Sequence, residues 1–383
     1  MTGLSIDKTQ NSTKIYSRGG SNLANVPELT GDSAKASSHR GSHLQIIASA
    51  GSGKTETVSQ RIARLIEEGV APSEIVAFTF TERAAEELKA RVRARTELFA
   101  GKESVDKLGN MYIGTIHGFC FRLLTKYVTQ FESYDVIDEN QTVAFIHRQA
   151  NLLGIRNLNP SWGLFKSVSK FVSGLNVIEN ELIPLSNVPE PMSSTVTKFY
   201  QLLDEYRLLS FGRQIVEAVR VLKDSEIHTI VSSDIKHLVV DEYQDVNPAQ
   251  EELIRLLAKP KGSADVVVVG DDDQAIYQWR GSTTENITKF QQRYKRVATF
   301  ELLTNRRSRP DIVEAANQFA KSIPGRITKE MSATRKRNGP SLYIDYDHLT
   351  EEDEVKEIAN TILSLNQRGY RFRDIAILVR GKT

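Results

Sequence analysis

The sequence predicts an α/β fold in which a parallel β-sheet is covered by helices on both faces. Apolar runs at 44–48 and 75–79 have the length and composition of buried strands, and a helical stretch follows each of them. Repetition of a strand and then a helix is typical of parallel sheets. Three later runs, at 237–241, 265–270 and 297–302, continue the same pattern.

The length of 383 residues is sufficient for two or three domains. A helix at 351–367 between strands at 342–345 and 375–379 indicates that a second α/β domain begins near the end of the chain. We therefore expect a disordered, Ser- and Gly-rich leader over 1–42, a first core formed by 43–120 and 233–303, a helical insertion over 121–232, and the beginning of a second domain over 304–383.

Charge and cysteine content exclude several classes of protein. The net charge is +2, from 50 basic and 48 acidic residues, so a nucleic-acid site would have to come from local groups of residues. The single cysteine, Cys120, excludes an internal disulfide framework and Cys-rich metal centres, and it fits a reducing compartment. We find neither a signal peptide nor an apolar run of membrane-spanning length, so we expect a cytoplasmic protein without a membrane partner.

A glycine-rich loop connects the first predicted strand to its helix. Gly51 and Gly53 allow backbone N–H groups to turn inward around phosphates, and the start of the helix adds partial positive charge there. Lys54 would reach the β- and γ-phosphates, and the Thr55 hydroxyl would bind Mg²⁺. Ala48 stands where the strict pattern has glycine. The residues of this predicted nucleotide site are Ala48, Ser49, Ala50, Gly51, Ser52, Gly53, Lys54 and Thr55.

Polar side chains also follow the strands at 237–241 and 265–270. Asp241 is placed to hold Mg²⁺, directly or through water, and Glu242 to orient and deprotonate an attacking water. Gln274 could sense the γ-phosphate by hydrogen bonding. Alone, such residues are common at solvated strand ends. Together with the glycine-rich loop they predict ATP hydrolysis, because the loop would bind the phosphates and the carboxylates would hold Mg²⁺ and activate the water.

Two aromatic residues and a cation, Tyr277, Trp279 and Arg280, lie just beyond Gln274. Proteins that hold single-stranded nucleic acid without sequence preference stack bases on aromatic side chains. The alternative is that Tyr277 and Trp279 are core residues, but their place directly after a polar strand end favours DNA binding. A different class of protein, a P-loop kinase or small-molecule ATPase, would have no use for these aromatic residues beside the nucleotide.

Six segments occur in a characteristic order: the loop at 48–55, FTFTERAAEEL at 78–88, GTIHGF at 114–119, DEYQD at 241–245, VGDDDQAIYQWRG at 269–281 and NRRS at 305–308. In this respect the chain resembles the UvrD/Rep/PcrA-type DNA helicases of superfamily one, over about 44 to 380. The resemblance implies a RecA-like core with ATP as substrate and Mg²⁺ as cofactor. It also implies DNA partners, either single strands or duplexes with a single-stranded tail, and other repair or replication proteins.

The resemblance further implies roles for particular residues. Arg307 would reach the γ-phosphate from the second core domain and stabilise charge in the transition state. Phe80 would stack on bases with the aromatic residues described above, and Thr115 and His117 would lie near the backbone of the DNA strand. The insertion would correspond to the family's helical subdomain, and movement would be 3′ to 5′ on single-stranded DNA.

The sequence departs from the family in three places. An upstream glutamine that reads adenine is missing, which weakens the prediction that ATP is preferred over other nucleotides. Arg306 stands where a tyrosine often stacks on the nucleotide base, although a guanidinium plane can also stack. The family's later motifs would lie beyond Thr383, so we expect nucleotide binding from this chain. The alternative function is a truncated helicase fragment that binds ATP or DNA without productive unwinding.

Overall fold

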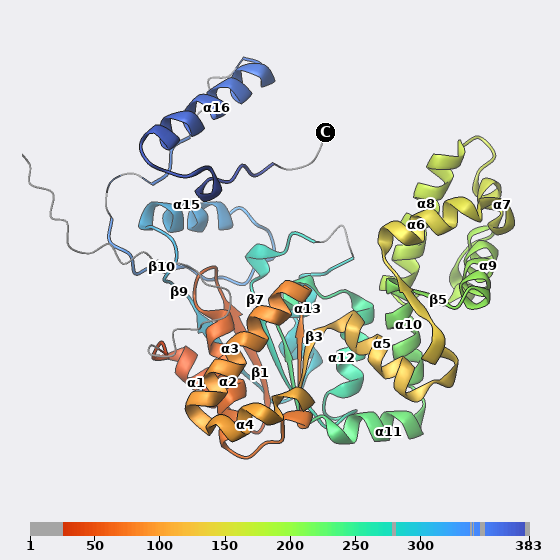
Figure 1. Ribbon diagram of the computed structural model, residues 1–383, viewed down its shortest axis with the longest axis horizontal. Helices are drawn as coiled ribbons and strands as arrows, with labels where there is room; N and C mark the ends of the chain where they lie inside the picture. The colour runs from red at the N-terminus through yellow and green to blue at the C-terminus, as the bar shows by residue number, and fades with distance from the viewer. Residues whose placement is uncertain (1–25, 278–280, 338, 340, 345–348, 380–383) are drawn as a thin grey trace, which may run out of the picture.

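A six-stranded parallel sheet, in the order β3-β2-β6-β7-β1-β8, lies at the centre of the chain (Figure 1). The computed structural model describes residues 26–277, 281–337, 339, 341–344 and 349–379. The strands are β1 (His43–Ala48), β2 (Ile75–Thr79), β3 (Tyr112–Thr115), β6 (His237–Val240), β7 (Asp265–Gly270) and β8 (Val297–Leu302). The α/β fold class is therefore confirmed, and the five predicted strands of the first core agree to within one residue.

Side chains along each strand alternate between two layers of helices. Ile75 and Ala77 of β2 pack into one layer, whereas Val76 and Phe78 pack into the other. Because both faces of the inner strands β2, β6 and β7 are buried, these strands are mostly apolar, whereas in the edge strand β8 the polar residues Thr299 and Glu301 are exposed. The first layer contains α1 (Asp32–Ser38), α2 (Lys54–Glu67) and α3 (Glu82–Ala100), and the second contains α5 (Ile116–Tyr127), α10 (Phe211–Val221), α11 (Ser225–Asp234) and α12 (Pro248–Leu257).

Helix α1 differs from the prediction of a poorly packed segment between residues 31 and 42. Its small side chains at Ser33, Ala36 and Ser37 are buried against the rest of the first core. The guanidinium of Arg61, from α2, donates to the carbonyl oxygens of Ala36 at 2.8 Å and of His39. A side chain remote in sequence thus donates hydrogen bonds to the carbonyl groups at the end of the helix. Residues 1–25 of the predicted leader lie outside the described residues.

The chain between β3 and β6 adds a group of helices with a hydrophobic cluster of its own. Strands β4 (Asp135–Ile137) and β5 (Leu208–Ser210) pair in parallel with each other, outside the central sheet. The hydrophobic cluster is formed mainly by the helices that connect these two strands in sequence, and Phe171 and Phe199 are completely buried in it. Figure 1 shows these helices to one side of the sheet. They are α6 (Glu139–Arg148), α7 (Ala150–Leu153), α8 (Leu164–Asn180) and α9 (Met192–Glu205).

The part that follows β8 contains the predicted helices, but the predicted strands are not formed. Residues 342–344 and 375–379 have no strand partner in the described part of the chain, and Leu378 is 93% exposed. None of the described helices is both long enough and apolar enough to span a membrane. The remaining elements are α4 (Lys102–Asp106), α13 (Glu285–Thr288), α14 (Phe290–Arg293), β9 (Thr304–Asn305), α15 (Pro310–Ala320), β10 (Ser332–Ala333) and α16 (Glu351–Gln367).

A buried carboxyl group, that of Glu179 in α8, connects α8 to α10. The Tyr200 hydroxyl donates to Glu179 Oε1 at 3.1 Å, and the Glu179 carboxyl also lies against Gly212. Burial raises the pKa of Glu179 to about 7, although the Tyr200 hydrogen bond and the charge of Arg213 act in the opposite direction. The folded state therefore binds the proton of this carboxyl more tightly than the unfolded state does.

We predict that Glu179 makes the free energy of unfolding depend on pH. Its folded pKa of about 7 lies above the ordinary value of 4.5, so this free energy is highest at the acidic end of that interval and decreases as the pH rises through it. The expected decrease is about 3 kcal/mol. Glu179→Gln should remove this decrease, and urea unfolding at a series of pH values between 4.5 and about 7 measures it. The exposed Glu181→Gln is the control, and an unchanged pH dependence in Glu179→Gln would contradict the prediction.

Candidate nucleotide and nucleic-acid site

Three neighbouring strands of the sheet, β6, β7 and β1, carry at their carboxyl ends the residues predicted to handle a nucleotide. The glycine-rich loop follows β1, Asp241 and Glu242 follow β6, and Gln274 lies in the loop after β7. In parallel sheets, ligands bind outside the carboxyl ends of the strands. The topology therefore brings together segments that are 188 positions apart in the sequence, as for Lys54 and Glu242.

The loop at 49–53 has a conformation that excludes side chains at its glycines. Gly51 has φ 67° and Gly53 has φ 96°, both in the left-handed region that favours glycine. A Cβ atom at Gly51 would lie 2.8 Å from Arg307 Cβ, so the segment after β9 approaches the loop closely. Ser49 attaches the loop to β8, with its N–H and Oγ donating to the Leu302 carbonyl at 3.0 and 3.1 Å.

An ion pair between Lys54 Nζ and Glu242 Oε2, at 3.0 Å, joins the loop to the acidic end of β6. The Gln244 amide donates to the same Glu242 oxygen at 2.9 Å. Burial raises the pKa of Asp241 above its ordinary value, and the Glu242 charge acts in the same direction, whereas Lys54 opposes it. Lys54 therefore partly balances two adjacent carboxyl groups.

Two buried polar atoms near this ion pair lack a hydrogen-bond partner among the described residues. They are Ser52 Oγ in the loop and Asp245 Oδ1 after β6. Burial, with the Glu242 charge acting in the same direction, raises the pKa of Asp245 to about 7. Unsatisfied buried polar groups are rare in native proteins, and a polar ligand can supply the missing partners. The site therefore fits a bound phosphate group with its metal ion.

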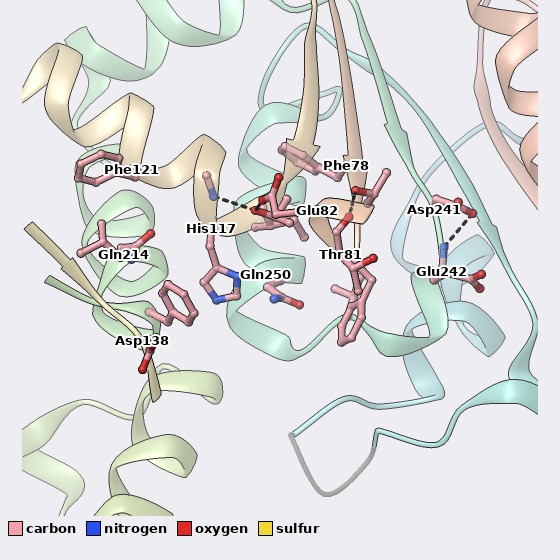
Figure 2. A pocket seen from close by; sticks show the side chains of 18 of the residues that line it. Phe78, Thr81, Glu82, His117, Phe121, Asp138, Gln214, Asp241, Glu242 and Gln250 are labelled. Atoms are coloured by element: carbon pink, nitrogen blue, oxygen red, sulfur yellow. Dashed lines mark hydrogen bonds between the residues drawn. The ribbon is translucent and has the colours of Figure 1, made fainter. Parts of the chain in front are cut away.

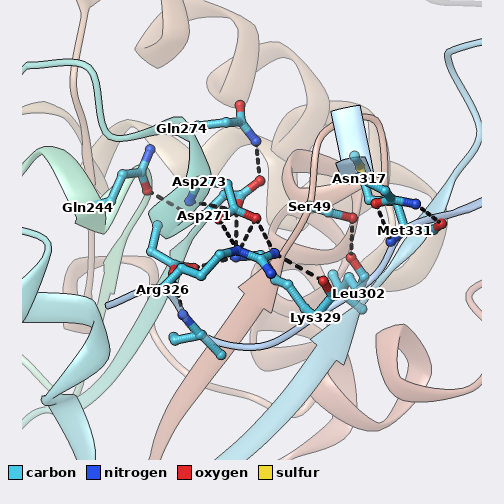
Figure 3. Close-up of polar contacts among 12 residues, drawn as sticks. Ser49, Gln244, Asp271, Asp273, Gln274, Leu302, Asn317, Arg326, Lys329 and Met331 are labelled. Atoms are coloured by element: carbon cyan, nitrogen blue, oxygen red, sulfur yellow. Dashed lines mark hydrogen bonds and ion pairs between the residues drawn. The ribbon is translucent and has the colours of Figure 1, made fainter. Parts of the chain in front are cut away.

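The structure places the other residues predicted to bind nucleotide at different distances from the loop. Arg306 contacts the loop backbone, because its N–H donates to the Gly51 carbonyl and its Nη1 to the Ser52 carbonyl, each at 2.9 Å. Arg307 is exposed beside the same loop. The Gln274 amide instead donates to the side chain of Asp271, within its own loop (Figure 3). The catalytic role of Gln274 stays a prediction.

The residues predicted to bind DNA come from the carboxyl ends of β2 and β3, on the other side of β6, and from the loop after β7. The rings of Phe80, after β2, and Tyr277 have centroids 5.0 Å apart and an interplanar angle of 30°. Thr115 caps α5 by accepting from the Gly118 N–H at 3.2 Å. His117 packs on Phe211 with ring centroids 5.2 Å apart, and burial lowers the pKa of His117 to about 4. Predicted residues Trp279 and Arg280 lie outside the described residues.

A cleft of about 620 Å³ extends from the acidic end of β6 to the helical insertion. Figure 2 shows side chains from the ends of β2, β3 and β6 on one wall, and those near β4 and α10 opposite. Predicted DNA-binding residues Phe80, Thr115 and His117 line this cleft, together with Asp241 and Glu242. The cleft therefore connects the predicted nucleotide residues to the predicted DNA residues.

Sequence reasoning missed two cations that lie beside Asp271, Asp272 and Asp273. Lys329 Nζ is 3.1 Å from Asp271 Oδ1, and Arg326 donates twice to the Asp273 carboxylate, at 2.7 Å each. Neither cation belongs to a recognisable motif. The available signal was the row of three carboxylates after a buried strand, because such a row needs nearby positive charge when it is buried.

Residues 29–295 match the UvrD/REP helicase N-terminal domain, and residues 300–383 match the UvrD-like helicase C-terminal domain. ATP-dependent DNA helicase PcrA of Staphylococcus epidermidis is 31% identical over 346 residues, which make up 88% of this chain and 46% of the relative. The protein of that name in Staphylococcus aureus is 30% identical over 353 residues, with the same two shares. The chain thus spans about half the length of these curated relatives. Since the first domain match alone covers more than half of its sequence, the chain belongs to the UvrD/REP helicase family.

Proposed function

We propose that this chain forms the ATP-handling part of a DNA helicase that hydrolyses ATP while moving 3′ to 5′ along single-stranded DNA and unwinding duplexes. The ion pair between Lys54 and Glu242, at 3.0 Å, carries the proposal, because it assembles a phosphate loop and a candidate general base at one place. The family, and the names of relatives as ATP-dependent DNA helicases, support DNA as the substrate. We extend the proposal to DNA repair or replication in the cytoplasm, which the single cysteine supports.

The mechanism begins with an exchange of partners at Lys54. Lys54 and Glu242 form an ion pair in the structure. The β- and γ-phosphates offer Lys54 a partner of higher charge, so their binding releases the Glu242 carboxylate. The Gln244 amide, at 2.9 Å from Glu242 Oε2, still orients that carboxylate. Glu242 can then accept a proton from the attacking water, and Arg307 can stabilise charge on the γ-phosphate.

The donors at the site fit Mg²⁺. The ion would be held by the Thr55 hydroxyl and the Asp241 carboxylate, because Mg²⁺ is commonly bound by one or two carboxylates together with substrate phosphates. The described residues contain no group of three or more His, Cys, Asp or Glu that could hold a metal ion. When bound, Mg²⁺ would neutralise charge that develops on the phosphates.

DNA binding is assigned to the end of the sheet next to the insertion. The rings of Phe80 and Tyr277, inclined at 30° to each other, offer an aromatic surface, and Phe80 lines the same cleft as Thr115 and His117. Aromatic stacking holds bases without selecting their sequence. Nucleotide and DNA would therefore occupy neighbouring positions along one edge of the sheet, which suits a motor that couples hydrolysis to movement.

We predict that Lys54→Ala lowers DNA-stimulated ATP hydrolysis by at least about 100-fold, because it removes the charge that holds the phosphates. The measurement is phosphate release with and without an oligothymidine strand. Lys89→Ala, which removes an exposed lysine of α3, is the matched control and should behave as the unmodified protein. Hydrolysis that DNA does not stimulate in the unmodified protein would contradict the proposed function.

We predict a different pattern for Glu242→Gln. The amide keeps the shape of the side chain but cannot accept the proton of water, so kcat should fall by about 100- to 10,000-fold. Nucleotide affinity should not fall, because the variant frees Lys54 from its ion pair. Titration with a fluorescent ATP analogue measures the affinity. Affinity and kcat that decrease together would indicate that Glu242 holds the nucleotide and is not the base.

The direction of movement is tested by strand displacement. We predict that a duplex with a 3′ single-stranded tail is unwound at least about tenfold faster than the same duplex with a 5′ tail, because only the 3′ tail lets the motor run towards the duplex. The Lys54→Ala variant is the control for unwinding that does not depend on ATP. Faster unwinding from the 5′ tail would reverse the proposed direction.

A further inference from the structure

Three consecutive carboxylates follow β7 and lie largely out of contact with water. Asp271 and Asp272 are only 3% and 5% exposed. Carboxylates that are close together and buried repel one another, so they keep their charge only when a cation lies among them. The conformation of this loop therefore depends on the cations that neutralise its carboxylates.

The positive charge comes from the segment between α15 and β10. Lys329 Nζ pairs with Asp271 Oδ1 at 3.1 Å, with Asp273 Oδ2 at 2.9 Å, and with Asp272, and only 2% of the lysine side chain is exposed. Arg326 forms a two-point pair with Asp273, at 2.7 Å for each contact (Figure 3). We refer to Lys329 and Arg326 as the cation clamp.

The pKa shifts of Lys329 and Asp273 both favour the charged form of the group. Burial alone would lower the pKa of Lys329, but the hydrogen bonds and charges of the three aspartates outweigh it, so this pKa is raised. Burial would raise the pKa of Asp273, yet the bonds from Arg326 and Lys329 leave it below its ordinary value. The clamp therefore replaces the water that would otherwise solvate the carboxylates.

Hydrogen bonds continue from the clamp to the phosphate loop. The Asp271 N–H donates to Gln244 Oε1 at 3.0 Å, and the Gln244 amide donates to Glu242 Oε2 at 2.9 Å. Glu242 in turn pairs with Lys54 at 3.0 Å. Asp271 also accepts from the amide of Gln274. The carboxylate that contacts Lys329 thus belongs to the residue that positions both glutamines of the site.

At its other end, the segment that carries the clamp is fixed to α15. The Asn317 side chain accepts from the Met331 N–H and donates to the Met331 carbonyl, each at 2.9 Å. Displacement of α15 would therefore move Lys329 relative to the loop after β7. Contacts of this kind show a physical connection, and only a measurement of turnover shows coupling.

We propose that Lys329, supported by Arg326, is a positioning residue through which the part of the chain after β9 sets the rate of ATP turnover. Lys329 holds Asp271 in the place from which Gln244 orients Glu242. This inference rests on the proposed function, and it adds to that function a control point whose hydrogen bonds and ion pairs among the described residues involve neither the phosphate loop nor Phe80, Thr115 or His117. A purely structural ion pair would stabilise the fold without changing kcat selectively.

The test compares Lys329→Met with Lys321→Met, which makes the same chemical change at an exposed lysine after α15. Arg326→Gln is the second variant and decides the question if Lys329→Met does not fold, because Arg326 is less buried and fixes the Lys329 backbone through a 3.0 Å bond. We measure kcat with and without oligothymidine, the Kd of a fluorescent ATP analogue, and the thermal midpoint of unfolding.

We expect Lys329→Met to lower DNA-stimulated kcat by about tenfold or more while the Kd changes by less than about threefold. Arg326→Gln should lower kcat in the same selective way but by less, and Lys321→Met should match the unmodified protein. A kcat within about twofold of the unmodified value in both clamp variants would contradict the positioning role of the clamp. A Kd that increases in proportion to the decrease in kcat would contradict it as well.

The outcome also separates this inference from the proposed function. Normal DNA stimulation in the unmodified protein together with unchanged turnover in the clamp variants overturns the clamp alone. Hydrolysis that DNA does not stimulate overturns the proposed function, and basal kcat in the same variants then decides the clamp. An unmodified protein without any hydrolysis overturns both.

Discussion

The common direction of the six central strands is the constraint on which the site depends. Because all of them run parallel, their carboxyl ends meet at one edge of the sheet, and every segment that follows a strand starts there. The order of the strands then divides the edge into two parts. Strands β1, β7 and β6 present the phosphate loop and the carboxylates, whereas β2 and β3 present Phe80, Thr115 and His117, which we propose bind DNA together with Tyr277 from the loop after β7.

The position of β7 between β6 and β1 gives Gly270 a particular importance. A Cβ atom at this position would lie 2.5 Å from Gln244 Oε1 and 2.8 Å from Ile287 Cδ1. The bare end of β7 is therefore what allows Gln244 to contact both Asp271 and Glu242. Lys54, from the loop after β1, and Glu242, at the end of β6, form their ion pair across the end of β7, where Gly270 has no side chain.

The parts of the fold that local sequence determines were predictable, and those that depend on distant partners were not. Five of the six central strands and the phosphate loop are contiguous patterns, so their places follow from periodicity and glycine positions, whereas the short strand β3 was not predicted. Helix α1 was not predicted, because its C-terminal carbonyl groups are bound by Arg61 from another helix. The cation clamp was not predicted, because Lys329 lies 57 positions from Asp272 in the sequence. The strands predicted at 342–345 and 375–379 show the reverse error: a strand needs a hydrogen-bonded neighbour, which an apolar run cannot specify.

The short pair of β4 and β5 has a consequence for how this architecture can change. The chain leaves the core at one of these strands and returns at the other, and the two run side by side from Asp135 to Ile137 and from Leu208 to Ser210. Entry and exit are therefore adjacent, and everything between them contributes nothing to the order of the central strands. An exchange or enlargement of that module would leave the order of the central strands unchanged, but it would alter the wall of the cleft that the module shares with the ends of β2, β3 and β6.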